Sequence, residues 1–172
     1  MKLSLRLFPN KVINTALFLT LVISSNLVSA QRQPPAPGPS LDLALEAAQE
    51  AIKVCANNGY KVTATVVDSV GEIKAQIRAD DVGARTLTIS KRKTNTAIKY
   101  AEATVVISEK IKTDKALAAE IEQDDNLLSW GGARPLMSDG KLVGAIGVSG
   151  APGGDKDDVC AVAAIEKIKA RL

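Results

Sequence analysis

The chain has 172 residues, of which 22 are basic, 19 are acidic and none is histidine. A chain of this length supports one domain with a hydrophobic core of its own. The absence of histidine excludes every Ser-His and Cys-His nucleophile pair and removes the commonest protein ligand for metal ions. The sequence therefore contains no recognisable catalytic constellation, and it does not decide whether the protein is an enzyme.

The first 30 residues have the pattern of an export signal. Three basic residues precede an apolar run that ends in the small-x-small sequence Val28-Ser29-Ala30. This run is shorter and more polar than the roughly 20 apolar residues of a membrane-spanning helix, so we predict a signal peptide over residues 1–30 rather than an anchor. We therefore expect a periplasmic or secreted protein that has no membrane attachment after cleavage.

Cleavage of this leader changes the charge balance of the chain. The leader contains three of the basic residues and no acidic one, so the remaining 142 residues carry 19 basic and 19 acidic side chains. Both phenylalanines also lie in the leader, which leaves Tyr60, Tyr100 and Trp130 as the aromatic residues. A neutral chain with so few stacking side chains lacks the features of nucleic-acid binding, and we expect no nucleic-acid partner.

The first half of the domain is predicted as a helix followed by two strands. Residues 31–40 contain four prolines and are expected to form an extended linker. Ser40 caps a helix whose apolar residues recur every three or four positions, and Asn57-Asn58-Gly59 ends it. The next two segments are rich in β-branched residues or alternate between apolar and polar side chains. They are predicted as the antiparallel strands 62–68 and 72–78.

The second half is predicted as three helices and a β-hairpin. Thr104–Ser108 is β-branched and suggests a short strand, and Leu127–Trp130 suggests a further strand or the approach to the hairpin. This element order predicts an α+β domain over residues 41–172, built around one antiparallel sheet. The helices are expected over 87–103, 114–123 and 155–172, and the hairpin joins 135–137 to 142–148 through an Asp-Gly turn.

The stretch Trp130–Asp158 contains eight of the twelve glycines and surrounds the predicted hairpin. Gly144 and Gly147 lie inside its second strand, where glycine usually marks a bulge or a close approach to the backbone. The approaching group is a ligand, a partner chain or a neighbouring helix of the same chain. We expect a glycine-lined hollow beside the sheet edge to be the functional site, with packing by a neighbouring helix as the simpler alternative.

Cys55 and Cys160 are the only cysteines and lie on the first and last predicted helices. In an exported chain they are candidates for a disulfide, which would close a loop of about 100 residues. The alternative is two buried thiols that act as small apolar side chains. Sequence alone leaves both states open.

Two further motifs are better explained as helix features. Ser90-Lys91-Arg92-Lys93 matches the S-x-x-K signature of penicillin-binding enzymes, but no K-T-G motif follows and a basic helix face is the simpler interpretation. Gly150–Gly154 precedes a helix start as phosphate-binding loops do, but three aspartates follow and would repel an anion. We interpret these aspartates as helix capping and predict no metal site, since calcium needs about six or more oxygens.

Four sequence pieces together resemble the GlcG/HbpS-like family. They are Val66-Val67-Asp68-x-x-Gly71, Lys93-x-x-Thr96-Ala97, Thr104, and the run Asp139–Gly150 with the sequence DGKLVGAIGVSG. The last piece is specific to the family, and the resemblance covers Leu41 to Leu172. It implies a profilin-like three-layer α/β/α fold with one antiparallel sheet and assembly into homo-oligomers. It also implies that some members bind haem or a related tetrapyrrole, which is a small planar ligand.

The resemblance further implies a set of ligand-binding positions. Carried over by position, they are Lys93, Thr96, Thr104, Gly131, Gly132, Pro135, Gly144, Gly147, Ser149 and Gly150. The chain departs from the family at three points: Thr94 replaces a frequent alanine, one extra residue precedes Pro135, and the histidine expected to ligate haem iron is missing. Met137, Tyr60, Tyr100 and the two thiols are the remaining candidates for an axial iron ligand.

The sequence supports three hypotheses of function. The first is an exported small binding protein of this family, for haem or a related tetrapyrrole. The second is a cofactor-free oligomeric accessory module whose Gly/Ala-rich strand packs against a partner chain. The third is an uncharacterised enzyme that acts on a small carboxylate, with Lys93 as base or anion clamp.

Overall fold

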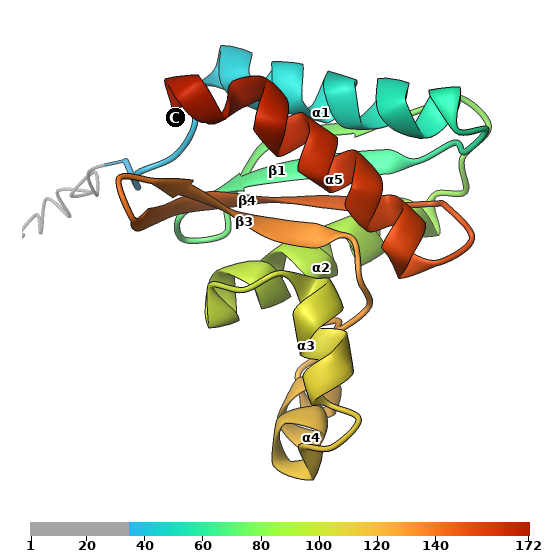
Figure 1. The fold of residues 1–172 in the computed structure, drawn as a ribbon, viewed down its shortest axis with the longest axis vertical. Helices are drawn as coiled ribbons and strands as arrows, with labels where there is room; N and C mark the ends of the chain where they lie inside the picture. Colours follow the sequence, from blue (N-terminus) through green and yellow to red (C-terminus); the bar gives the residue numbers. More distant parts are fainter. Residues whose placement is uncertain (1–34) are drawn as a thin grey trace, which may run out of the picture. The chain divides into compact units, whose positions relative to one another are not determined.

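A computed structural model describes residues 35–172 of the chain (Figure 1). The signal peptide predicted for residues 1–30 lies outside the described residues. None of the described helices is long and apolar enough to cross a membrane. The elements follow in the order α1 (Leu41–Asn57), β1 (Thr63–Asp68), β2 (Ile73–Arg78), α2 (Arg85–Tyr100), α3 (Thr104–Lys110), α4 (Lys115–Gln123), β3 (Ala133–Ser138), β4 (Lys141–Ser149), α5 (Gly154–Ile168) and the 3-10 turn η1 (Lys169–Arg171).

The four strands form one antiparallel sheet in the order β2-β1-β4-β3. Asp139 and Gly140 turn the chain between β3 and β4, with φ angles of 48° and 73° that suit a tight hairpin turn. β1 and β4 lie in the centre and pair from Thr63↔Ser149 to Asp68↔Gly144. The glycine-rich strand β4 therefore lies in the middle of the sheet, so Gly144 and Gly147 do not line a hollow beside a sheet edge as we expected.

Helices cover both faces of the sheet, which gives the expected α/β/α layers (Figure 1). α1 and α5 pack on one face and against each other, while α2 lies on the opposite face. The first face holds the main apolar core, where small α1 side chains allow the helix to approach the strands closely. Burial of this apolar surface is the main driving force for the fold. The core includes Ala44, Ala47, Ala48, Ala51, Ala64, Val66, Ile146 and Val148.

The sheet face covered by α2 combines a small apolar cluster of Val67, Ala97, Ala133 and Ala145 with several polar side chains. The hydroxyl oxygens of Thr63 and Thr86 lie 2.6 Å apart, and those of Thr65 and Ser90 lie 2.7 Å apart. Gln76 Nε2 donates to Thr65 Oγ1 at 2.8 Å. Because each of these buried groups has a partner, the layer avoids the cost of unsatisfied polar atoms. Helix α2 thus brings polar side chains into the interior, and two hollows lie along its sides.

The segment Thr104–Ser108 lies in helix α3 and not in a strand, so the strand suggested by its β-branched residues is wrong. Thr104 and Ile107 are buried together on one helical face. Ile107 also belongs to a small apolar cluster with Ile121 and Leu127. This packing overrides the β-propensity of the individual residues, which is a weak preference.

The segment Leu127–Trp130 also forms no strand. Side chains of α2 form hydrogen bonds with backbone groups of this segment instead. Arg92 Nη2 donates to Leu127 O at 2.7 Å, and Leu128 N donates to Thr96 Oγ1 at 2.8 Å. The segment is therefore anchored to α2 before it enters β3.

A disulfide joins Cys55 of α1 to Cys160 of α5, with 5.6 Å between the two Cα atoms. Both cysteines are fully buried in the main core. The bridge takes up both thiols of the chain, so neither is available as an iron or metal ligand.

Candidate functional site

A hollow of about 420 Å³ lies between α2, Trp130 and the loop that connects β4 to α5. Trp130 is 59% exposed, and the backbone of the glycine-rich loop forms another wall. The volume is in the lower part of the range for small-molecule sites, about 300–1,000 Å³. The lining residues are Thr86, Ile89, Lys93, Trp130, Ser149, Gly150, Ala151, Gly153, Gly154 and Asp157.

Lys93 and Asp157 form a buried ion pair in the wall of this hollow. Lys93 Nζ donates to Asp157 Oδ2 at 2.8 Å and to Val148 O at 2.9 Å. Asp157 Oδ1 accepts from Ala151 N at 2.9 Å. The two side chains are only 2% and 4% exposed. The network ties α2 to the end of β4 and the start of α5, and it leaves the ammonium group one further N–H to donate.

Burial opposes charge on both members of this pair. It lowers the pKa of Lys93 because the ammonium group loses its hydration, while attraction to Asp157 acts in the other direction. It raises the pKa of Asp157 for the same reason, against the attraction of Lys93. A lowered pKa of Lys93 suits the hypothesis that Lys93 acts as a catalytic base. However, Lys93 Nζ already donates to the carboxylate of Asp157 and to the carbonyl of Val148. In this arrangement Lys93 is therefore a structural cation and not a free base.

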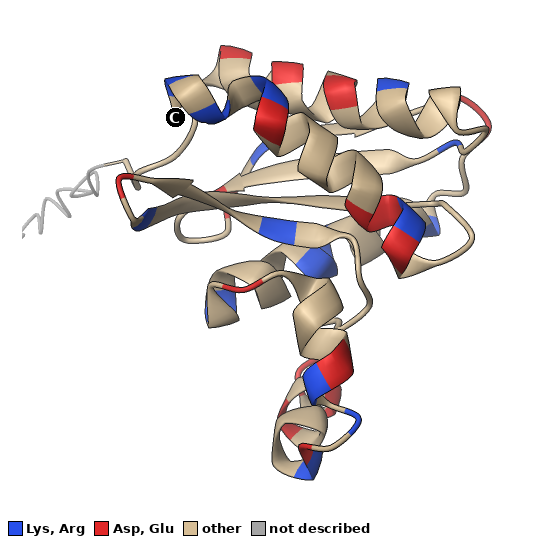
Figure 2. Cartoon of the chain, in the orientation of Figure 1, with Lys and Arg blue, Asp and Glu red and all other residues tan. Residues whose placement is uncertain are grey.

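A second ion pair lies at the same helix start. Arg134 on β3 donates from Nε and Nη2 to the two carboxylate oxygens of Asp158, at 2.9 and 2.6 Å. Figure 2 shows the acidic residues gathered at the first turn of α5. Asp157 and Asp158 thus bind cations from α2 and β3, so helix capping alone does not account for them.

The structure brings three of the predicted ligand-binding residues into the lining of the hollow, namely Lys93, Ser149 and Gly150. The remaining predicted residues lie outside this lining and make contacts within the chain. They are Thr96, Thr104, Gly131, Gly132, Pro135, Gly144 and Gly147.

Gly144 and Gly147 allow close packing within the chain itself. A Cβ atom at Gly147 would lie 2.6 Å from Ser90 O and 2.7 Å from Thr94 Cγ2, both on α2. A Cβ atom at Gly144 would overlap Val67 O in β1. The close approach is therefore made by a neighbouring helix and strand, which was the simpler alternative. The expectation that this strand face packs against a partner chain is wrong for Gly147.

Gly147→Ala is expected to reduce the free energy of unfolding by about 1–3 kcal/mol, because the added methyl group overlaps a backbone oxygen of α2. Gly83→Ala is the matched control, since a Cβ atom there meets nothing within 4 Å. This second change should be neutral or slightly stabilising. Urea denaturation of both variants measures the difference, and equal stabilities would contradict the packing role of Gly147.

Thr96 and Thr104 fix the segment that carries Trp130. Thr96 Oγ1 accepts from Leu128 N at 2.8 Å, and Thr104 Oγ1 accepts from Ala133 N at 2.9 Å. Both threonines are fully buried. Their two anchors lie on either side of Trp130 in the chain, so these residues act on the hollow through the backbone and not by contact with a ligand.

Gly131 and Gly132 let the same segment pass closely against the start of α5. A Cβ atom at Gly131 would lie 3.1 Å from the Gly154 carbonyl carbon, and one at Gly132 would lie 2.6 Å from Asp157 Cβ. Gly132 also has a φ of 114°, which side chains rarely adopt. Pro135 follows on β3 and pairs with Ala145. These positions shape the fold around the hollow without lining it.

Sequence reasoning missed Trp130 and Asp157 as residues of the hollow. Trp130 is the only tryptophan of the chain and precedes a Gly-Gly pair, a signal that could have marked it. A buried lysine requires a carboxylate partner. The burial of Lys93 was hidden, however, because residues 91–93 have the pattern of a solvated basic face.

The sequence profile of a family described as haem degrading protein HbpS-like matches residues 40–166. The chain belongs to the HbpS-like family. This confirms the resemblance based on the DGKLVGAIGVSG run and the shorter pieces. No curated protein sequence matches this HbpS-like chain significantly.

Solved structures share the fold of this HbpS-like chain. HbpS itself is 27% identical with a TM-score of 0.70, over 78% of this chain and 93% of HbpS. Protein ORFY of Klebsiella pneumoniae is 22% identical with a TM-score of 0.72, over 82% of this chain and 97% of ORFY. PduOC, solved as a haem complex, is 23% identical with a TM-score of 0.69, over 76% of this chain and 95% of PduOC. At these identities the last two likenesses show the fold alone.

The hollow does not fit a haem that is held by its iron. Such a haem needs an axial protein ligand. None of the residues that line the hollow is a histidine, methionine, tyrosine or cysteine. The amine of Lys93 is engaged by Asp157 and Val148, and residues 35–172 contain no group of three or more His, Cys, Asp or Glu residues that could hold a metal ion.

The other candidates for an axial ligand lie apart from the hollow and from one another. Met137 is 44% exposed on β3. Tyr60 lies in a separate shallow hollow with Lys156, whose Nζ is 5.6 Å from the centre of the tyrosine ring. Tyr100 packs against the small apolar cluster beneath α3 and α4. None of the three lines the hollow beside Trp130.

Proposed function

We propose that this chain is a binding protein for a tetrapyrrole or a similarly planar ligand, which it holds by the face of the ring and not by a metal. The observation that supports the proposal is the hollow, where the exposed Trp130 lies with the bare backbone of Gly150, Gly153 and Gly154. A planar ring stacks on an indole, and backbone without side chains lets a flat ligand approach closely. The HbpS-like family and the haem complex of PduOC favour a tetrapyrrole as the ligand.

The charges around the hollow influence how such a ligand would lie. Asp157 neutralises Lys93, and Asp155 adds a negative charge in the first turn of α5. The hollow therefore has no net positive charge to receive carboxylates. We infer that the ring enters the hollow while its carboxylate groups face solvent. The free N–H of Lys93 and the hydroxyl of Ser149 remain as donors for a polar atom of the ring.

Haemin and iron-free protoporphyrin are expected to bind with affinities within about threefold of each other, because the hollow supplies no iron ligand. Trp130→Ala is expected to weaken both ligands about tenfold, which corresponds to the loss of one stacking contact. Titrations followed by ligand absorbance measure these affinities. In the unmodified protein, quenching of Trp130 fluorescence provides a second signal, because it is the only tryptophan.

Val70→Ala is the matched control, because Val70 is 65% exposed and lies outside the hollow. It should leave both affinities unchanged. Haemin binding that is far tighter than protoporphyrin binding would reveal iron ligation and contradict the proposed mode. Unchanged binding by Trp130→Ala would contradict the proposed site.

We also propose that the protein is exported to the periplasm or secreted. The Cys55–Cys160 disulfide supports export, because such bridges persist mainly in oxidising compartments. The mass of the protein recovered from outside the cytoplasm tests this, since it should be short by residues 1–30. The homo-oligomer implied by the family stays a prediction, and the native mass of the same sample measures it.

A further inference from the structure

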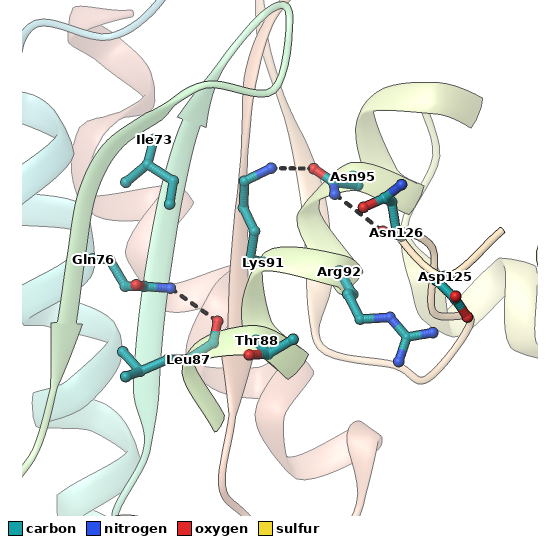
Figure 3. A pocket seen from close by; sticks show the side chains of 9 residues that line it. All are labelled: Ile73, Gln76, Leu87, Thr88, Lys91, Arg92, Asn95, Asp125 and Asn126. Atoms are coloured by element: carbon teal, nitrogen blue, oxygen red, sulfur yellow. Dashed lines mark hydrogen bonds between the residues drawn. The ribbon is translucent and has the colours of Figure 1, made fainter. Parts of the chain in front are cut away.

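A second hollow, of about 430 Å³, lies between α2, β2 and the loop that precedes β3 (Figure 3). It shares no lining residue with the hollow beside Trp130. The two hollows lie on different faces of α2. Residues 86, 89 and 93 line the first hollow, and residues 87, 88, 91, 92 and 95 line the second, each set recurring at spacings of three and four. Its lining consists of Ile73, Gln76, Leu87, Thr88, Lys91, Arg92, Asn95, Asp125 and Asn126.

The lining of this second hollow combines a cationic part with an apolar part. Lys91 and Arg92 contribute two positive charges, against one negative charge from Asp125. Ile73, which is 48% exposed, and Leu87 contribute apolar surface. Figure 3 shows Ile73 and Leu87 on the side of β2 and the two cations on the side of α2 and the loop. The combination suits a ligand with one anionic end and one apolar end.

The two cations have no carboxylate partner in the part of the chain that the structure describes. None of the ion pairs within residues 35–172 includes Lys91 or Arg92. Arg92 Nη2 donates to Leu127 O, but its buried Nε–H has no acceptor among residues 35–172. Burial lowers the pKa of Lys91 because its ammonium group is partly dehydrated, although Glu72 and Asp68 act against this. An anion in the hollow would compensate Lys91 and reduce the excess of positive charge in the lining.

Hydrogen bonds fix the walls of the hollow (Figure 3). Gln76 Nε2 donates to Leu87 O at 2.9 Å, which connects β2 to α2. Asn95 Nδ2 donates to Asn126 O at 3.0 Å, and Asn95 Oδ1 accepts from Lys91 Nζ. Because these side chains are already ordered, a ligand would lose little free energy to immobilising them.

We propose that this second hollow binds a small carboxylate that carries a short apolar chain. The ammonium of Lys91 receives the carboxylate through a charge-assisted hydrogen bond, and the guanidinium of Arg92, which extends toward the loop in Figure 3, adds positive charge to the hollow. The apolar chain lies against Ile73 and Leu87. The site goes beyond the proposed tetrapyrrole function and is independent of it, because the two hollows have separate linings.

Butyrate is a suitable probe because it carries one carboxylate and a propyl chain. In NMR titrations of the full-length protein, it is expected to shift the side-chain amide signals of Gln76, Asn95 and Asn126 until they saturate. Butanol, the neutral analogue, should leave these signals in place. Inorganic phosphate should bind at least about tenfold more weakly, because it places no apolar group against Ile73 and Leu87.

Lys91→Met is expected to weaken butyrate binding about tenfold, through the loss of one charge-assisted hydrogen bond. Lys74→Met is the matched control, since Lys74 is an exposed lysine of β2 outside the lining. Arg92→Lys keeps the positive charge, so it should leave butyrate binding within about threefold while circular dichroism confirms the fold.

Three results would overturn the proposal. One is butyrate binding that is unchanged in Lys91→Met. Another is phosphate binding that is tighter than butyrate binding, which would identify a different ligand class. The third is the absence of saturable shifts up to about 50 mM butyrate, a concentration that reveals even weak millimolar binding.

Discussion

Lys93→Met is expected to lower the free energy of unfolding by about 3–5 kcal/mol, the cost of leaving one member of a buried ion pair alone. Methionine keeps an unbranched stem and removes the charge. Asp157 would remain buried with Ala151 N as its donor, and Val148 O would lose the donor it has now. A loss of this size is a large part of the about 5–15 kcal/mol that stabilises a typical domain. Urea denaturation measures it.

The exposed pair Lys61–Asp81 provides the matched control for this prediction. Its nitrogen and oxygen lie 2.6 Å apart, but the side chains are 59% and 80% exposed, so Lys61→Met should cost less than about 1 kcal/mol. Asp157→Asn in the Lys93→Met background should recover part of the loss, because a neutral amide needs no counter-charge and its oxygen still accepts from Ala151 N. Equal costs for Lys93→Met and Lys61→Met would contradict the importance of the buried pair.

The stability deficit of Lys93→Met should also shrink as the pH falls. Burial raises the pKa of Asp157 in the folded protein, and the variant removes the attraction of Lys93 that opposes this shift. Because the pKa of Asp157 is higher in the folded state than in the unfolded state, Asp157 takes up a proton in the folded state first when the pH falls. The free energy of unfolding of the variant therefore increases as the pH falls through the folded-state pKa of Asp157, and it decreases as the pH rises through that pKa. Denaturation at neutral pH and at about pH 4 compares the two conditions.

The layers of this fold could be predicted because their patterns are local. The alternation along β2 and the repeat of three and four residues along α1 predicted a strand and a helix, and both elements are present. Their buried faces were predicted only in part: α1 is buried through its alanines and Cys55 while Leu41 is 55% exposed, and Ile73 of β2 is 48% exposed where the strand register shifts. Thr104–Ser108 and Leu127–Trp130 were not predictable in this way. Their conformations depend on a distant apolar cluster and on α2 side chains that reach their backbone.

The candidate site was less predictable than the fold, because its contacts join residues that are far apart in the sequence. The partner of Lys93 lies 64 residues later in the chain, and nothing near either residue indicates the other. Gly144 and Gly147 did indicate a close approach to the backbone, which the structure contains. Which group approaches depends on the position of β4 between β1 and β3, and this position follows from the pairing of all four strands.

Replacement of both cysteines, Cys55→Ala with Cys160→Ala, is expected to lower the free energy of unfolding by about 4–5 kcal/mol. The bridge joins residues separated by 105 positions and connects the two helices that cover the main core. Without the bridge, the unfolded chain gains conformational entropy, because the bridge had constrained most of its length. In the chain-entropy model, a loop of about 100 residues corresponds to about 4.7 kcal/mol.

Reduction of the unmodified protein separates the loop-closure contribution from packing. The reduced protein keeps both buried sulfur atoms, whereas the double alanine variant also loses their volume from the core and gains a cavity. We expect the oxidised protein to be the most stable, the reduced protein to be less stable, and the double alanine variant to be the least stable. Because both cysteines are buried, the reductant must be present while the protein is unfolded. Equal urea midpoints for the oxidised and reduced protein would mean that the broken bridge gives the unfolded chain little freedom, and that packing alone holds α1 against α5.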